Sequence, residues 1–174
     1  MSSTTRATGG EPEQPGAAAI RVLVVEDGDE YLTNLTTFVA RGIEYWQAKS
    51  GEDACRLVPD LDPDVVYLDM RFDRIPEEDL LGDLVQLTGR FNGDVSRARR
   101  FQQDNQGLFI LRALRQAGFR KPVILSYDFS GEEKRFAALS GNDPSLSYCP
   151  DYADAKAIRH AIVQAVGGEG PASP

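Results

Sequence analysis

One short segment limits the possible folds of this chain more than any other. Residues 65–68 read Val-Val-Tyr-Leu, and a single acid, Asp69, follows them. The run is too short for a helix, and Pro63 disfavours one just before it, so it predicts a strand that is buried on both faces. Such strands belong to parallel sheets covered by helices, where ligands bind beyond the carboxyl ends of the strands. Asp69 is therefore either a turn residue or part of a site in that crevice.

Similar apolar runs recur along the chain and alternate with amphipathic helical patterns. Strands are expected at residues 20–25, 43–48, 65–69, 122–126 and 145–149, each followed by a helical pattern. This alternation predicts a parallel sheet with right-handed crossover connections. We expect an α/β fold of the flavodoxin-like, doubly wound class, in which five strands take the order 2-1-3-4-5.

The region after Asp69 departs from this pattern. A connection from a strand to a helix is usually about two to six residues long, whereas the next regular helix begins only near residue 106. Residues 72–105 therefore form a helical insertion between the third strand and the third helix. Within the insertion, acids open one helical pattern at 77–87, and a second pattern at 94–103 carries three arginines.

Both ends of the chain differ in composition from the middle. Residues 1–18 and 167–174 are rich in small and polar residues, which bury too little apolar surface to offset the entropy of ordering. They are therefore predicted to be disordered tails. Between them, residues 19–166 have the length of a single domain.

The overall composition excludes several classes of protein. A net charge of −8 argues against direct nucleic-acid binding, for which a basic surface is typical. No apolar stretch is long enough to cross a membrane, and the N-terminus lacks the apolar region of a signal peptide. Cys55 and Cys149 are too few and too far apart for a disulfide framework or a metal site. We therefore expect a cytoplasmic protein without a membrane partner.

Acids follow the first and the third predicted strands. Glu26 and Asp27 come directly after residues 20–25, and Asp69 ends the third strand. These two strands are neighbours in the doubly wound order, so the three carboxylates should converge at its switch point. Converging carboxylates repel one another unless a cation neutralises them, and Mg²⁺ prefers such oxygen ligands together with water. Ser126 ends the fourth strand and should point into the same crevice, although capping and turn roles also suit these residue types.

Together these segments resemble the receiver domain of bacterial two-component response regulators. The matching segments are Val-Leu-Val-Val-Glu-Asp at 22–27, the stretch at 48–54, Pro-Asp-Val-Val-Tyr-Leu-Asp-Met at 63–70, and the stretches at 107–118 and 122–126. The individual motifs are short, but their order and placement are specific. The resemblance extends over residues 20–166, apart from the insertion.

The resemblance implies a role for each polar residue in the crevice. Glu26 and Asp27 would hold Mg²⁺, together with Asp69 and the backbone carbonyl of Arg71. Asp69 would also accept a phosphoryl group from the phosphohistidine of a histidine kinase or phosphotransfer protein, and Ser126 would hydrogen-bond that group. A receiver is a signalling module rather than an enzyme, and a downstream protein target reads its conformational equilibrium. The insertion is a candidate docking element for such a partner.

Three positions depart from the family pattern. After the fifth strand the family has a lysine before a proline, whereas this chain reads Cys149-Pro150. Leu146 stands where a switch aromatic is usual, and Tyr127 stands where a small residue is usual. The phosphate-binding cation is therefore missing from its expected place, and Arg71 or an arginine of the insertion is the candidate replacement.

Three interpretations stay open at this point. In the first, the chain is an atypical receiver that is phosphorylated at Asp69. In the second, it is a pseudoreceiver, a phosphorylation-independent interaction module. The third is a Mg²⁺-dependent phosphatase or nuclease on a similar sheet, for which Asp73 is the only nearby second acid. His160, the single histidine, lies within the last predicted helix and is not expected to act as a base.

Overall fold

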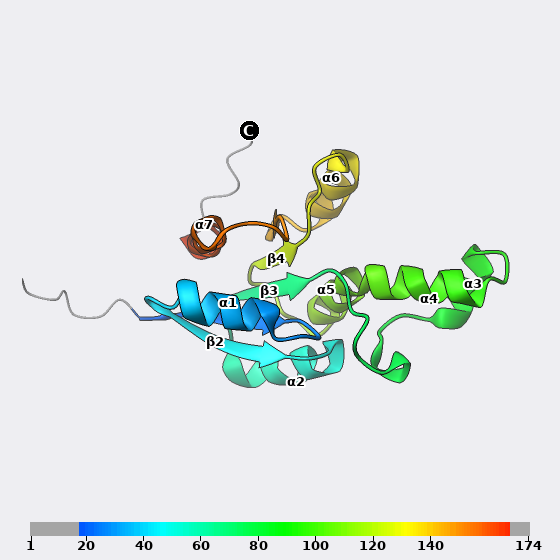
Figure 1. Cartoon of the computed structure of the whole chain (residues 1–174), viewed down its shortest axis with the longest axis horizontal. Helices are drawn as coiled ribbons and strands as arrows, with labels where there is room; N and C mark the ends of the chain where they lie inside the picture. The colour runs from blue at the N-terminus through cyan, green and yellow to red at the C-terminus, as the bar shows by residue number, and fades with distance from the viewer. Residues whose placement is uncertain (1–17, 168–174) are drawn as a thin grey trace, which may run out of the picture.

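The structure is a computed structural model that describes residues 18–167, and Figure 1 shows its helices and strands. The strands are β1 (Ile20–Val25), β2 (Ile43–Ala48), β3 (Val65–Asp69), β4 (Val123–Ser126) and β5 (Leu146–Cys149). The helices are α1 (Glu30–Phe38), α2 (Gly51–Leu61), α3 (Leu84–Arg90), α4 (Val95–Asp104), α5 (Gln106–Gln116), α6 (Glu133–Asn142) and α7 (Ala155–Gly167), with a short 3-10 helix, η1 (Glu77–Asp79). The predicted tails, 1–18 and 167–174, lie outside the described residues except for their innermost residues, and Gly167 ends α7.

The five strands form one parallel sheet in the order β2-β1-β3-β4-β5, which confirms the predicted fold class and strand order. The register between β3 and β4 places Asp69 beside Ser126. The register between β4 and β5 places Ser126 beside Cys149. Because all five strands run in the same direction, their carboxyl ends meet at one edge of the sheet.

Helices cover both faces of the sheet. On one face the strands pack against α2, α5 and α6, and on the other they pack against α1 and α7. Tyr67 of β3 belongs to the second face and is fully buried. Side chains alternate along a strand, so Asp69 is directed to the same face as Tyr67. Within residues 18–167, no helix is both long and apolar enough to cross a bilayer.

Helix α2 continues through a proline. Proline inside a helix usually ends or kinks it, but α2 extends through Pro59 to Leu61. A proline in the last turn removes only one backbone hydrogen bond, the one that its missing N–H would have donated to Cys55. The helix ends instead at Asp62, which takes a left-handed conformation with φ of 43°.

The first half of the insertion also differs from its prediction. The helical pattern at 77–87 is not one helix but the 3-10 turn η1 followed by the separate helix α3. Gly82 interrupts the pattern with a φ of 109°. Asp83 then starts α3, because its side chain accepts a hydrogen bond from the N–H of Gln86 at 3.0 Å. The second predicted helix, at 94–103, is confirmed as α4.

The insertion forms a helical arm that is joined to the core at its base. Figure 1 shows α4 continuing from α5 away from the sheet, with α3 at the far end, and only Asn105 separates α4 from α5. At the base, Phe72 and Leu80 are buried in the same cluster as α2 and α5. The arm is therefore an extension of the domain core and not a detached loop.

Two buried glutamines fasten the base of this arm. The side chain of Gln106 accepts from the N–H of Leu81 at 2.7 Å and donates to its carbonyl at 3.1 Å. Gln102 donates to the carbonyls of Leu81 and Gly82, both at 3.2 Å. These amides satisfy backbone groups that would otherwise be buried without a partner. The chain before α3 is thereby held against the junction of α4 and α5.

Gly107 brings α5 into direct contact with the end of β3. Its N–H donates to the carbonyl of Met70 at 3.0 Å. A Cβ atom at this position would lie 2.5 Å from the carbonyl oxygen of Asp69 and 2.9 Å from the Cα of Met70. Only glycine permits this approach, so Gly107 fixes where the chain leaves β3.

Candidate functional site

A pocket opens at the carboxyl edge of the sheet, around Asp69. Its volume is about 410 Å³. The lining residues come from α1, β3, β4, α6, the loops that follow β3, β4 and β5, and the junction of α4 and α5: Tyr31, Asp69, Met70, Arg71, Asp104, Asn105, Ser126, Tyr127, Arg135 and Asp151. A second hollow of about 300 Å³ lies next to it and also contains Asp69 and Arg71, together with Glu26 and Asp27. The structure therefore brings all the residues predicted for the site to one edge of the sheet.

The carboxylate of Asp69 is electrostatically uncompensated. Within residues 18–167 it accepts one long hydrogen bond, from the N–H of Arg71 to Oδ1 at 3.4 Å. Burial is the main reason that the pKa of Asp69 is raised to about 7. The negative charges of Asp27 and Glu26 also raise it, and the backbone N–H groups of Arg71 and Met70 lower it. A bound cation would relieve this repulsion.

Glu26 is committed to the start of α1. Its side chain is buried, and its two oxygens accept hydrogen bonds from the backbone N–H groups of Tyr31 (2.9 Å) and Leu32 (2.8 Å). Gln47 donates to the same carboxylate at 3.2 Å. A carboxylate at a helix N-terminus is favoured by the unpaired N–H groups and by the helix dipole. The metal-ligand role of Glu26 stays a prediction, and in this structure its oxygens serve α1.

Asp27 is turned toward the first residues of the insertion. Its Oδ2 atom accepts hydrogen bonds from the N–H groups of Asp73 (2.8 Å) and Arg74 (2.7 Å). Its Oδ1 atom accepts none from the part of the chain that the structure describes. Arg74 is held a second time, through an ion pair with Glu30 at 2.5 Å. Asp27 thus links the end of β1 to the insertion and keeps one oxygen for a ligand.

The carboxylates at this edge meet part of what a metal ion requires. Within residues 18–167, no group of three or more His, Cys, Asp or Glu side chains is gathered closely enough to hold a metal ion. Mg²⁺ itself is often bound by only one or two carboxylates plus water. Asp27 and Asp69 both line the smaller hollow, and the raised pKa of Asp69 marks a local excess of negative charge. The donor set therefore fits Mg²⁺ through two carboxylates rather than three.

Ser126 and its neighbours form the wall of the pocket along β4 and β5. Ser126 is buried, and its hydroxyl accepts a hydrogen bond from the phenol of Tyr67 at 3.4 Å. Tyr67 in turn packs edge-on against Tyr31, with 5.6 Å between ring centroids. The serine hydroxyl therefore rests on the buried Tyr67, which packs against the half-buried Tyr31 next to Asp69.

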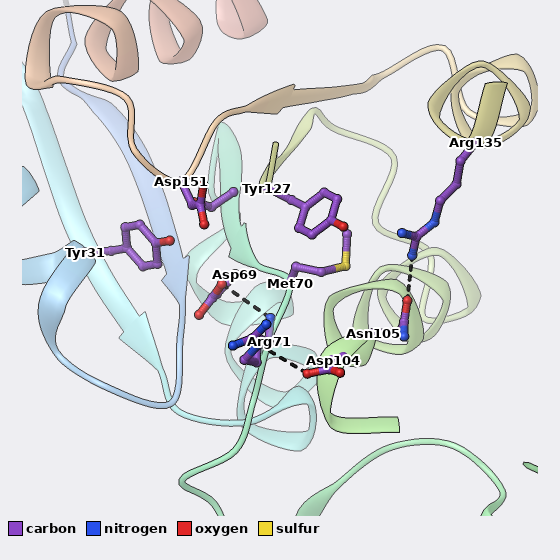
Figure 2. A pocket seen from close by; sticks show the side chains of 10 residues that line it. Tyr31, Asp69, Met70, Arg71, Asp104, Asn105, Tyr127, Arg135 and Asp151 are labelled. Carbon is purple, nitrogen blue, oxygen red and sulfur yellow. Dashed lines mark hydrogen bonds and ion pairs between the residues drawn. The ribbon is translucent and has the colours of Figure 1, made fainter. Parts of the chain in front are cut away.

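Two arginines line the pocket from different directions. Figure 2 shows Arg71 between Asp69 and Asp104, and Arg135 on the far side, where it reaches Asn105. The Nε atom of Arg71 lies 3.2 Å from Oδ1 of Asp104. The Nη2 atom of Arg135 donates to Asn105 at 2.5 Å. Both partners, Asp104 and Asn105, belong to the junction of α4 and α5.

Solved structures that resemble this chain identify its fold. No protein-family model and no curated protein sequence matches the chain. The Francisella response regulator 1452 receiver domain is 17% identical, with a TM-score of 0.57 over 85% of this chain and 97% of that chain. A response regulator receiver domain protein from Clostridium thermocellum is 18% identical, with a TM-score of 0.56 over 85% and 94%. The receiver domain of NtrX from Brucella abortus is 15% identical, with a TM-score of 0.57 over 85% and 99%. The chain has the fold of a response regulator receiver domain.

In this receiver fold, the last strand ends in a buried thiol. Cys149 ends β5 beside Ser126, and its side chain is almost inaccessible to solvent. Burial raises the pKa of the Cys149 thiol, which favours its neutral form. Cys149 therefore contributes no cation to the pocket.

Sequence reasoning found the residues at strand ends of this receiver fold and missed those on helices. Asp69 and Ser126 were predicted because each closes an apolar run. Arg135, Asp104 and Asn105 were not, because nothing in the sequence near them indicates that α6 and the α4–α5 junction face the same pocket. The path of the insertion brings Asp104 and Asn105 to the pocket, and the position of α6 brings Arg135.

Proposed function

We propose that this chain is an atypical receiver module that accepts a phosphoryl group on Asp69 with the help of Mg²⁺. The donor would be the phosphohistidine of a histidine kinase or a phosphotransfer protein in the cytoplasm. The observation that carries this proposal is the uncompensated carboxylate of Asp69 at the switch point of a receiver fold, next to the hydroxyl of Ser126. Ligand sites of open α/β sheets lie at this point.

The residues around Asp69 suit phosphoryl transfer. The Asp69 carboxylate is the nucleophile and forms an acyl phosphate. Ser126 hydrogen-bonds the transferred group from β4. Asp27, Asp69 and the backbone carbonyl of Arg71 would hold Mg²⁺, while Glu26 supports the site through α1. The metal would supply positive charge to offset that of the phosphoryl oxygens.

We propose that this module signals by binding a downstream protein target. The insertion presents a large surface beside the site, and two of its valines are unusually exposed, Val85 at 83% and Val95 at 50%. Arg97 and Arg100 on α4 form no ion pair within the described residues 18–167. Apolar side chains among unpaired cations are typical of protein interaction surfaces.

Two other interpretations of the same protein predict different results. A pseudoreceiver is supported by the neutral Cys149 at the end of β5, because that position contributes no cation for a phosphoryl group. A Mg²⁺-dependent phosphatase or nuclease would need Asp73 as a second acid, and the backbone N–H of Asp73 is held by Asp27 in this structure. Turnover of p-nitrophenyl phosphate with Mg²⁺ would support that enzyme, and we expect none.

The proposal is tested by incubation with acetyl phosphate and Mg²⁺, followed by intact-mass spectrometry. We expect the wild type to gain one phosphoryl group and Asp69→Asn to gain none. Asp60→Asn, which removes an exposed acid of α2, serves as the matched control and should behave like the wild type. Calorimetric titration with Mg²⁺ should show weaker binding to Asp27→Asn and to Asp69→Asn. A wild type that gains no phosphoryl group would favour the pseudoreceiver.

A further inference from the structure

Arg135 on α6 already has a polar partner at each of its terminal nitrogens. The Nη1 atom of Arg135 lies 2.6 Å from Oε2 of Glu132, and its Nη2 atom donates to Oδ1 of Asn105 at 2.5 Å. Its guanidinium also lies 5.7 Å from the ring centroid of Tyr127 and 5.7 Å from that of Phe129. Both terminal nitrogens therefore have partners, and the group is fixed by aromatic packing. A phosphoryl group on Asp69 would have to break this network to reach Arg135.

Arg71 is held far more loosely. Its side chain is 67% exposed, and Asp104 is its only ion-pair partner within residues 18–167. Its guanidinium donates no hydrogen bond to any of these described residues. Asp104 is itself 44% exposed. An ion pair between two exposed side chains is weak and exchanges readily for a stronger partner.

Arg71 is also the arginine placed closest to the reacting group along the chain. Its own N–H donates to the carboxylate of Asp69, and Figure 2 shows its side chain beside that carboxylate. It lines both the larger pocket and the smaller hollow, in each case together with Asp69. The other arginine of the smaller hollow, Arg74, is paired with Glu30 at 2.5 Å.

We propose that the guanidinium of Arg71 is the cation that binds the phosphoryl group on Asp69, in place of the lysine that β5 lacks. This inference rests on the proposed function above. With acetyl phosphate as donor, a carboxylate oxygen of Asp69 forms a bond to phosphorus, the bond from phosphorus to the acetate oxygen breaks, and acetate leaves with the bonding electron pair. Arg71 exchanges the single carboxylate of Asp104 for phosphoryl oxygens, whose higher charge and spacing suit a guanidinium.

The test compares rates of phosphorylation by acetyl phosphate with Mg²⁺, followed by intact-mass spectrometry. We expect Arg71→Gln to react about 100-fold more slowly than the wild type, the lower end of the effect seen when one charge-stabilising donor is removed. Arg71→Lys should recover part of the rate, because it keeps a cation in reach. Arg112→Gln removes an exposed arginine of α5 that does not line the pocket, and it should react at the wild-type rate.

The outcomes separate this inference from the proposed function. A wild type that gains no phosphoryl group overturns the proposed function itself. A wild type that is phosphorylated, with Arg71→Gln reacting at the same rate, overturns only the role of Arg71. A slow Arg135→Gln beside an unaffected Arg71→Gln would assign the role to Arg135 instead. Thermal unfolding of each variant shows that a slow reaction does not come from loss of the fold, and failure of Arg71→Lys to recover any rate would also count against the inference.

Discussion

The charged form of Asp69 is destabilised in the folded protein, and its neighbours do not compensate for this. Its pKa of about 7 in the folded protein lies above the ordinary value of 3.8, because the side chain is buried next to Asp27 and Glu26. The folded protein therefore binds this proton more tightly than the unfolded chain does. Stability is highest while Asp69 is protonated, falls as the pH rises from 3.8 to about 7, and the loss is complete above that pH.

Replacing this carboxylate should therefore stabilise the metal-free protein at high pH. We expect the unfolding free energy of Asp69→Asn, relative to that of the wild type, to increase by about 2 kcal/mol between about pH 5 and about pH 8. Urea unfolding in EDTA measures this difference. Added Mg²⁺ should reduce the difference, because a cation stabilises the ionised wild type. Asp60→Asn controls for the loss of one acid. A difference between Asp69→Asn and wild type that is the same at both pH values would contradict this prediction.

At the scale of residues, the sequence predicts which polar residues end a strand but not which groups they bind. The end of an apolar strand can be read directly, and so the positions of Asp69 and Ser126 were predicted. The partners of a carboxylate cannot be read in this way. Glu26 and Asp27 are adjacent and look equivalent in the sequence, yet one accepts N–H groups of α1 and the other accepts N–H groups of the insertion.

At the scale of elements, the insertion depends on buried amides as well as apolar packing. Periodicity predicted one helix over 77–87, because leucines recur there at helical spacing. The chain instead makes a sharp bend at Gly82, and Leu81 is held by the side chains of Gln102 and Gln106. Such contacts join residues far apart in sequence, so no local pattern indicates them.

Gln106→Ala should loosen the base of the insertion without unfolding the sheet. The substitution leaves the part-buried N–H of Leu81 without a partner, which costs about 1–3 kcal/mol, whereas the Leu81 carbonyl keeps its hydrogen bond from Gln102. We expect faster hydrogen exchange and earlier proteolysis around residues 80–83. Gln103→Ala is the matched control, since the side chain of Gln103 makes no hydrogen bond to any of residues 18–167. Equal exchange in the two variants would show that Gln106 does not fasten the arm.

At the scale of the whole molecule, the strand order could be predicted from the sequence, whereas the path of the insertion and its contacts with the site could not. Alternating strands and helices leave few possible topologies, so the order 2-1-3-4-5 could be predicted. The insertion follows no such rule, and its path determines which helix ends face the pocket. It touches the site at two places, where Asp27 holds its first residues and where Asp104 pairs with Arg71. A change of charge at Asp69 is therefore positioned to affect the arm.

The two adjacent acids after β1 should control different parts of the molecule. Asp27→Ala removes the acceptor for the N–H groups of Asp73 and Arg74, at a cost of about 1 kcal/mol for each hydrogen bond. Hydrogen exchange should therefore accelerate in the first residues of the insertion and stay unchanged in α1. Glu26→Ala should give the opposite pattern, because its N–H partners lie in the first turn of α1.

The matched control for the Asp27 experiment is Asp73→Ala. This variant keeps the Asp73 N–H and removes only a side chain that accepts no hydrogen bond from residues 18–167. Exchange in the first residues of the insertion should then stay as in the wild type. If Asp27→Ala leaves these residues equally protected, the ion pair of Arg74 with Glu30 holds the insertion instead, and Asp27 does not couple it to the site.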